Sequence, residues 1–488
     1  MAGIGFELKK IFKEGSLTRT VIGAGYSTVI TLGPTFSIMA AIIILYILLG
    51  FSSIPYADRA LISSTILYIF IFSVILTAPF SSVFSRYIAD KIYEEKFEDI
   101  LPSFYTGITI NVVLGAIIAF PFAWRLITVG QVSAFFAFHS VLTFLTLIIV
   151  LFSMIYLHAT KDYKIITFDF LLGMSIGIFV AILLNKFKLV NPIEAILYGL
   201  EIGLFIISFL EFSYIRKYFH VKSDNYFECV RYIGKHHNIF LCNLFYTLGL
   251  YAHNFVFWAS PMKIVVANSY YSMQSYDMAT CLAMFTNIST MILFTVMAET
   301  KFHDKYQIYN SAVVTSTLEQ ITKYKKSMFR LLVQETNLLI SIQAIISIII
   351  FLFIVIFLPD YGFGGMVMTI YPSLAAAFYV IFIMYSNIIF LYYFNDSKGA
   401  LITSLCFVIS TLIGSIIATH FRVEFYGAGA FAGAVIGWTF SYFRIHYLEK
   451  NFERHIFCNA HIIERKKGRI PDGTIYRRNH NEDKTVSL

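Results

Sequence analysis

Polar side chains at helical spacing inside apolar segments are the residues of this sequence best suited to chemistry. Such groups are costly in hydrocarbon, so they tend to face the interior of a helix bundle or a water-filled path. One stripe combines amides, a hydroxyl and a phenol with a neighbouring histidine: Asn243, Thr247, Tyr251, Asn254 and His253. Two shorter stripes consist of Tyr26, Thr28, Thr31 and Thr35, and of Ser73, Thr77 and Ser81. We predict that these stripes line a substrate path. The alternative is that the Ser and Thr hydroxyls only allow close helix packing.

One carboxylate lies deep within an apolar segment. Glu201 follows Glu194 by seven residues, and it therefore lies about 10 Å further along a helix that starts at Asn191 and Pro192. An unpaired carboxylate is expensive at such a depth. Glu201 is thus the best candidate for a charged functional residue, whereas Glu194 in the first turn is expected to complement the helix dipole.

Prolines and glycines mark special positions in the apolar segments. Interrupted helices create hinges of the kind that transporters use, although static kinks have the same signature. The hinge candidates are Pro34, Pro79 and Pro372. A stripe of small residues is better explained by close helix packing, and it consists of Gly429, Gly433 and Gly437.

No motif for enzymatic chemistry accompanies these residues. The sequence contains neither a GxxxxGK[ST] phosphate loop nor a DxD pair, so we expect no catalytic residue and no cofactor. His455, Cys458 and His461 recur every three residues and could hold zinc, but a fourth ligand is not evident and we expect no metal site. The five cysteines are scattered without a CxxC pair, so no disulfide framework is expected.

The elements that must position the polar stripes are long apolar helices. Of the 488 residues, 58% are hydrophobic and only 14% are charged, with a mean hydropathy of +0.72. A run of about 20 apolar residues crosses the hydrocarbon core of a bilayer as a helix. The sequence therefore predicts an all-α polytopic membrane protein with about twelve transmembrane helices, at residues 21–50, 61–84, 103–124, 132–157, 165–185, 193–215, 239–258, 278–298, 332–358, 365–393, 400–420 and 425–444.

Lys and Arg are distributed unevenly between alternate connections. The set that includes both ends of the chain holds 31 of the 37 basic residues, which predicts that both termini are cytoplasmic. Basic residues in the loops of a membrane protein mark the cytoplasmic side, and this accounts for the net charge of +8 without a nucleic-acid partner. The predicted domains are a cytoplasmic amphipathic helix (1–20), an N-terminal six-helix bundle (21–215), a cytoplasmic linker (216–238), a C-terminal six-helix bundle (239–444) and a basic cytoplasmic tail (445–488).

Two segments outside the spans are amphipathic. In the opening MAGIGFELKKIF, the apolar residues recur at helical spacing while the lysines fall largely elsewhere. We expect a retained interfacial helix rather than a signal peptide, because the next apolar run is too long and no cleavage site is clear. In the stretch 299–331, Phe302, Tyr306, Tyr309 and Val313 predict a helix that lies on the membrane surface or packs against the bundle's own loops. Both placements stay open.

Several motifs give the chain a resemblance to a known family. They are MAGIGFELKKIF at the start, YLHATKDYK (156–164), SYDMATCLA (275–283), AETKFHDKY (298–306) and LYYFNDSKGAL (391–401). These motifs resemble PelG, the family of inner-membrane transporters of the Pel exopolysaccharide, which is placed in the multidrug/oligosaccharidyl-lipid/polysaccharide flippase superfamily. The tail from about Glu464 is longer and more basic than the family's usual pattern, and it is expected to be disordered and to face lipid or a partner.

The resemblance implies two MATE-like six-helix bundles around a central cavity that opens alternately to each side. It implies export of an amino-sugar polymer with partial positive charge, from the cytoplasmic (inner) membrane. The implied partners are the polysaccharide, membrane lipids, a cytoplasmic glycosyltransferase and small membrane subunits, one of which senses cyclic-di-GMP. Three other functions stay open: a flippase for a lipid-linked oligosaccharide, a cation-coupled multidrug exporter, and a non-conducting scaffold of a polysaccharide synthase complex.

Overall fold

The computed structural model describes residues 17–160, 162–297, 301–361 and 364–459. Most of the predicted interfacial helix, residues 1–16, and His461 of the possible zinc pattern lie outside these ranges. The chain divides into two compact units, residues 1–445 and residues 446–488. The described part of the second unit comprises the end of α16 (Ala428–Lys450) and α17 (Phe452–Asn459).

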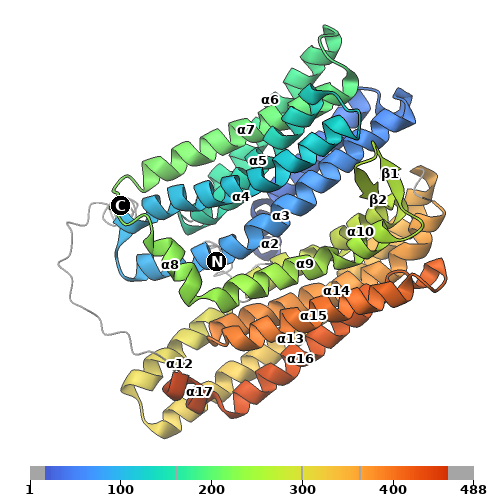
Figure 1. Ribbon diagram of the computed structural model, residues 1–488. Helices are drawn as coiled ribbons and strands as arrows, with labels where there is room; N and C mark the ends of the chain where they lie inside the picture. Colours follow the sequence, from blue (N-terminus) through green and yellow to red (C-terminus); the bar gives the residue numbers. More distant parts are fainter. Residues whose placement is uncertain (1–16, 161, 298–300, 362–363, 460–488) are drawn as a thin grey trace. The chain divides into compact units, whose positions relative to one another are not determined.

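Six long helices come first along the chain (Figure 1). They are α2 (Leu17–Leu48), α3 (Tyr56–Tyr93), α4 (Ile100–Thr128), α5 (Ala134–Thr160), α6 (Tyr163–Lys186) and α7 (Pro192–Tyr218). The predicted start of α7 is confirmed, because Asn191 is its N-cap, Pro192 is its first residue, and the Glu194 carboxylate accepts the Asn191 N–H at 3.2 Å. Short 3₁₀ turns, η1 (Phe51–Ser53) and η2 (Phe97–Asp99), precede α3 and α4.

Glycines allow α6 and α7 to pack closely. A Cβ atom added at Gly177 would lie 2.2 Å from the carbonyl oxygen of Gly199, and one added at Gly173 would lie 2.7 Å from that of Gly203. No other residue type fits at these positions without moving one of the two backbones. The two helices are therefore held side by side along this stretch.

The second series of elements starts after the linker (Figure 1). It comprises α9 (His237–Ala259), the strands β1 (Ile264–Val266) and β2 (Tyr270–Ser272), α10 (Gln274–Asn287), α11 (Ser289–Met297), α12 (His303–Thr315), α13 (Leu318–Phe357), α14 (Met366–Tyr393), α15 (Ser397–Ala418) and α16. The 3₁₀ turns η4 (Leu358–Tyr361) and η5 (Val423–Phe425) precede α14 and α16. The predicted glycine stripe packs α16 against α15, because an added Cβ atom at Gly433 would lie 2.0 Å from Thr411 Oγ1.

Every predicted span corresponds to helix in the structure. Within the described ranges, nine helices are long and apolar enough to cross a membrane: α3, α4 with η2, α5, α6, α7, α9, α13 with η4, α14 and α15. The eighth predicted span, 278–298, is not one helix but the pair α10 and α11. The all-α polytopic membrane fold is thus confirmed, and the break in the eighth span is a feature that the apolar pattern does not predict.

The break between α10 and α11 is built on a buried amide. Asn287 is fully buried, and its Nδ2 donates to the carbonyl oxygen of Ala375 on α14 at 2.9 Å. Its Oδ1 accepts from the Ser347 hydroxyl on α13 at 2.7 Å, and Gln343 in turn donates to that hydroxyl at 2.8 Å. Because polar groups inside a bundle need partners, this network fixes the break against two neighbouring helices.

The predicted linker is folded against the first helices. It contains the short helix α8 (Glu228–Lys235), whose Glu228 carboxylate contacts the Lys91 ammonium group on α3 at 2.7 Å. Lys91 also contacts Asp99 at 2.8 Å, and Asp99 accepts from the linker residue Ser223 at 2.6 Å. His236, which follows α8, packs on the Tyr232 ring, and burial lowers its pKa to about 4. His236 is therefore neutral at physiological pH.

The described part of the predicted amphipathic stretch, residues 301–331, packs against the bundle. Phe302 is fully buried, and its ring contacts Phe390, Tyr393 and Phe394 at the end of α14, with ring centroids 5.0–6.0 Å apart. Tyr309, one further member of the predicted apolar stripe, is also fully buried. Of the two placements that the sequence left open, the structure thus favours the helix packed on the bundle.

Candidate functional site

The polar stripe predicted on α9 divides into two clusters. At the start of α9, Asn243 Nδ2 donates to the Tyr392 hydroxyl of α14 at 3.0 Å. Thr247 is buried and donates to the carbonyl oxygen of Asn243 at 2.7 Å, while Tyr251 is half-buried. These contacts tie the first half of the stripe to the C-terminal bundle itself.

The second cluster surrounds a carboxylate that begins α10. Asp277 Oδ1 accepts from Asn254 Nδ2 at 2.7 Å and from Trp258 Nε1 at 2.9 Å, and Oδ2 accepts from the Met273 N–H at 3.1 Å. Asp277 lies in the first turn of α10, where the helix dipole favours an acid. We call Asn254, Trp258 and Asp277 the acid cluster. None of the basic residues within the described ranges forms an ion pair with Asp277, so its charge is oriented but not neutralised.

A histidine lies beside the acid cluster. His253 is fully buried, and its Nδ1 lies 3.0 Å from the Tyr276 hydroxyl of α10. Its Nε2 and the Asn254 Oδ1 are buried, and neither forms a hydrogen bond with another residue that the structure describes.

Aromatic rings from α3 adjoin the acid cluster. The Tyr68 ring stacks on Trp258, with centroids 4.9 Å apart and planes 5° from parallel, and Phe72 stacks on Phe255 at 5.9 Å. The Tyr68 hydroxyl donates to the Tyr271 carbonyl oxygen at 2.8 Å and accepts from the Tyr271 N–H at 2.9 Å. We call Tyr68, Phe72, Phe255 and Trp258 the aromatic seam, because it joins α3 to α9.

The β-hairpin holds the seam in place. Its strands pair antiparallel with Val265 opposite Tyr271, and a three-residue turn (267–269) joins them, with positive φ at Ala267 and Asn268. The Tyr270 ring lies edge-on to Tyr68 at 4.9 Å, and its hydroxyl accepts from Thr65 of α3 at 3.1 Å. The hairpin thus fixes the ring that stacks on the acid cluster.

Glu201 has a different environment from the α9 residues. Its Oε2 lies 2.6 Å from Nδ1 of His139 on α5, and both side chains are mostly buried. The His139 ring packs against Tyr198 and Phe135 at centroid distances of 4.2 Å and 4.7 Å. The structure therefore assigns Glu201 to a pair within the first six helices, and the role of this residue in a substrate path stays a prediction.

The remaining candidates occupy the first helices and α14. The side chains of Tyr26, Thr28 and Thr31 lie outside the described ranges, and Thr35 is exposed. Ser73 and Thr77 are buried, and Thr77 donates to the Ser73 carbonyl oxygen at 2.8 Å, as in ordinary helix packing. The hinge candidates are each inside one continuous helix: Pro34 in α2, Pro79 in α3 and Pro372 in α14.

The sequence pattern did not nominate Asp277, Trp258 or Tyr68. Asp277 falls one residue before the predicted eighth span, so a search for acids within the spans does not include it. The motif SYDMATCLA, which contains it, was the available signal. The combination of an unneutralised carboxylate with stacked rings suits a cation or a sugar ring, because aromatic faces attract cations. Within the described ranges, no group of three or more His, Cys, Asp or Glu side chains could hold a metal ion.

Solved structures of membrane transporters have a similar fold. The Vibrio cholerae MATE transporter VcmN in its bent form matches with a TM-score of 0.59 at 14% identity, over 93% of this chain and 99% of that chain. A multidrug resistance MATE transporter in its outward-facing conformation matches with 0.57 at 14% identity, over 92% and 99%. A MOP superfamily transporter from Pyrococcus furiosus matches with 0.55 at 15% identity, over 87% and 96%.

These likenesses establish a MATE-like fold for this chain, and the MATE-family neighbours have twelve transmembrane helices in two bundles. No curated protein matches the sequence. A family match covers residues 1–457, and its description is "PelG: Putative exopolysaccharide Exporter (EPS-E)". The chain is therefore a membrane transport protein that belongs to the PelG family.

Proposed function

We propose that this protein exports an exopolysaccharide of amino sugars across the cytoplasmic membrane, through a central cavity between its two six-helix bundles. The description of the PelG family supports an exopolysaccharide as the substrate. The MATE-like fold supports a flippase-type cycle in which the cavity opens alternately to each side. A continuous, channel-like cavity is the other form that such export could take.

The acid cluster and the aromatic seam are the observation that carries this proposal. Asp277 keeps an unneutralised carboxylate beside the stacked rings of Tyr68 and Trp258. An amino sugar presents an ammonium group for the carboxylate and an apolar ring face for the aromatic residues. One sugar unit could therefore contact all three side chains at the point where α3 meets α9.

We further propose the setting of the protein. The distribution of Lys and Arg supports cytoplasmic termini, which would place α8 and α12 on the cytoplasmic side and the β-hairpin on the other. A cytoplasmic glycosyltransferase and small membrane subunits are the proposed partners, with the glycosyltransferase supplying the polymer. The chain itself acts as a transporter and not as an enzyme.

The test replaces Asp277 in cells that make the polymer. Asp277→Asn keeps the shape and removes the charge, and extracellular polymer should fall about tenfold, the equivalent of about 1.4 kcal/mol for one charged contact. Glu424→Gln is the matched control, because Glu424 is an exposed acid at the same expected side of the membrane. The amount of each variant in the membrane is measured in parallel.

The location of the polymer separates the possible outcomes. Export failure should leave polymer inside the cells, whereas loss of total polymer would indicate a scaffold that only supports synthesis. Normal extracellular polymer with Asp277→Asn and with Trp258→Ala would refute the assignment of the site.

A further inference from the structure

The helical hairpin of α12 and α13 projects from the C-terminal bundle and has a fixed base. At the base, Lys301 contacts Glu335 of α13 at 2.6 Å, and Phe302 is buried among the rings of α14. The two helices are joined at Ser316 and Thr317. These contacts anchor the base of the hairpin.

The tip of the hairpin exposes apolar side chains. Val314 is 83% exposed and Leu318 is 71% exposed. α13 begins at Leu318, 14 residues before the expected start of its membrane span at Leu332, which corresponds to about 21 Å of helix. The headgroup layer on one side of a bilayer is only about 5–8 Å thick. Lipid therefore does not explain the exposed tip, because the tip lies beyond the headgroups.

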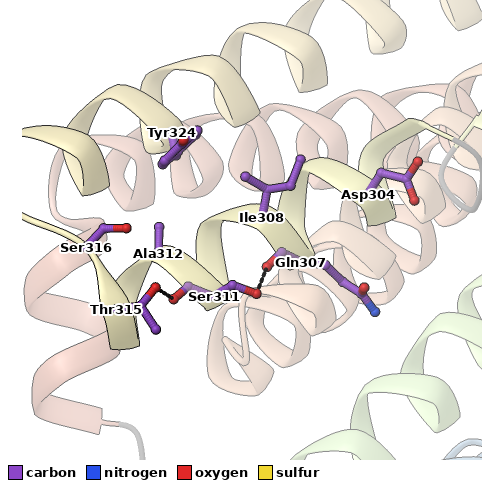
Figure 2. A pocket seen from close by; sticks show the side chains of 8 residues that line it. All are labelled: Asp304, Gln307, Ile308, Ser311, Ala312, Thr315, Ser316 and Tyr324. Carbon is purple, nitrogen blue, oxygen red and sulfur yellow. Dashed lines mark hydrogen bonds between the residues drawn. The ribbon is translucent and has the colours of Figure 1, made fainter.

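A groove follows the hairpin between its two helices (Figure 2). Its volume is about 500 Å³, and its lining consists of Asp304, Gln307, Ile308, Ser311, Ala312, Thr315, Ser316 and Tyr324. The Ser311 and Thr315 hydroxyls donate back to the α12 backbone, so their oxygens remain free to accept. Ile308 and Tyr324 supply exposed apolar surface within a polar rim. Such a groove suits an anchoring side chain from a protein partner.

The outer face of α13 is basic. Lys323, Lys326 and Arg330 are exposed, follow one another at spacings of three and four residues, and form no ion pair with another described residue. Over residues 303–331 the sequence has five Lys and Arg residues against two acids. An unpaired basic stripe beside an apolar groove is complementary to an acidic surface with an apolar anchor.

We propose that the α12–α13 hairpin is the docking surface for a soluble cytoplasmic protein with an acidic contact face. Lys323 and Lys326, which lie beyond the headgroup layer, attract that face, and the groove receives an apolar side chain. The orientation of the hairpin toward the cytoplasm rests on the proposed function. The glycosyltransferase proposed above is the defined occupant to test, since it delivers polymer at that side.

The experiment uses the full chain in polymer-producing cells. A photo-reactive phenylalanine analogue replaces Gln307 in the groove, and the control position is Glu95, an exposed residue of the loop after α3 on the same expected side. The probe is an epitope-tagged copy of the glycosyltransferase. Irradiation should give an adduct from Gln307 and none from Glu95.

Charge variants establish the basis of the contact. K323E/K326E should lower the adduct at least about fivefold, roughly 1 kcal/mol of a charge-dependent contact. K186E/K188E, which reverses two exposed charges at the opposite end, should leave it unchanged. If the first double variant does not accumulate in the membrane, K323Q/K326Q replaces it.

Two results would overturn the docking proposal. One is the absence of a glycosyltransferase adduct at Gln307, including the case in which the adduct contains phospholipid. The other is an adduct that charge reversal leaves unchanged. Both readouts are independent of export. The docking proposal can therefore fail while Asp277→Asn still blocks export, and it can hold while Asp277→Asn leaves export normal.

Discussion

Lys91 is a buried ammonium group held between two acids. Its contacts with Asp99 and Glu228 join α3, the start of α4 and the linker helix α8. Lys91 and Asp99 are both less than 5% exposed. A buried ion pair contributes little net stability over an apolar substitute, but the loss of one partner leaves an uncompensated charge.

Replacement of Lys91 should therefore destabilise the protein strongly. Lys91→Met removes the ammonium group and leaves Asp99 buried without its ion-pair partner, at a cost of about 3–5 kcal/mol. The matched control is Lys96→Met, because Lys96 pairs with Glu94 at 2.8 Å on the surface and exposed pairs contribute about 0–1 kcal/mol. Thermal unfolding of the purified variants in detergent measures the difference, and equal losses for the two variants would contradict the assignment.

At the scale of elements, each predicted span corresponds to helix in the structure, but the eighth is broken into α10 and α11. Length and hydropathy suffice for a membrane helix, because any run of about 20 apolar residues satisfies its own backbone. The same criterion does not detect the break at Ile288, because Asn287 changes the mean hydropathy of the eighth span very little. The β-hairpin is also missed, because strands of three residues are too short for a period-two pattern.

The sequence predicts only part of the candidate site, because helical spacing is local to one helix. Asn254 was found because its spacing on α9 is local to one helix. Its partner Asp277 lies 23 residues further along the chain, and Tyr68 lies on α3, about 190 residues before Trp258. Helical periodicity contains no information about which side chains of different helices meet. A stripe can thus nominate a helix face but not the group that the face contacts.

The glycine stripe of α16 gives a test at the same scale. Gly433→Ala should destabilise the protein by about 1–3 kcal/mol, because the new methyl group would lie 2.0 Å from Thr411 Oγ1 and 2.7 Å from the Thr411 backbone nitrogen. The matched control is Gly234→Ala in α8, where a Cβ atom meets no other atom within 4 Å. There, Ala should stabilise by up to about 1 kcal/mol through helix propensity. Thermal unfolding in detergent again provides the measurement, and a neutral Gly433→Ala would contradict close packing of α15 and α16.

At the scale of the whole molecule, α3 and α9 form the largest contact between the two series of helices, and the Phe36 ring of α2 also lies 6.5 Å from the Phe285 ring of α10. The Tyr68 and Trp258 rings meet near one end of this contact, and the Phe80 and Phe240 rings meet near the other at 5.1 Å. A cavity that opens alternately to each side must separate one end of α3 from α9 in each half of its cycle. A permanently continuous channel needs no such separation.

A covalent link across the aromatic seam distinguishes these two modes of export. Phe72→Cys with Phe255→Cys, joined by a short reducible cross-linker, should stop export under the alternating mode, and reduction of the linker should restore it. Both cysteines are introduced into a variant from which three native cysteines have been removed. Two of these are not fully buried, and the side chain of the third is outside the described part of the structure: Cys281, Cys406 and Cys458. Each single cysteine variant, treated with the same reagent, is the control. Undiminished release of polymer from fully cross-linked protein would show that α3 and α9 stay together during export, because a link at the seam excludes the rocking of one bundle against the other.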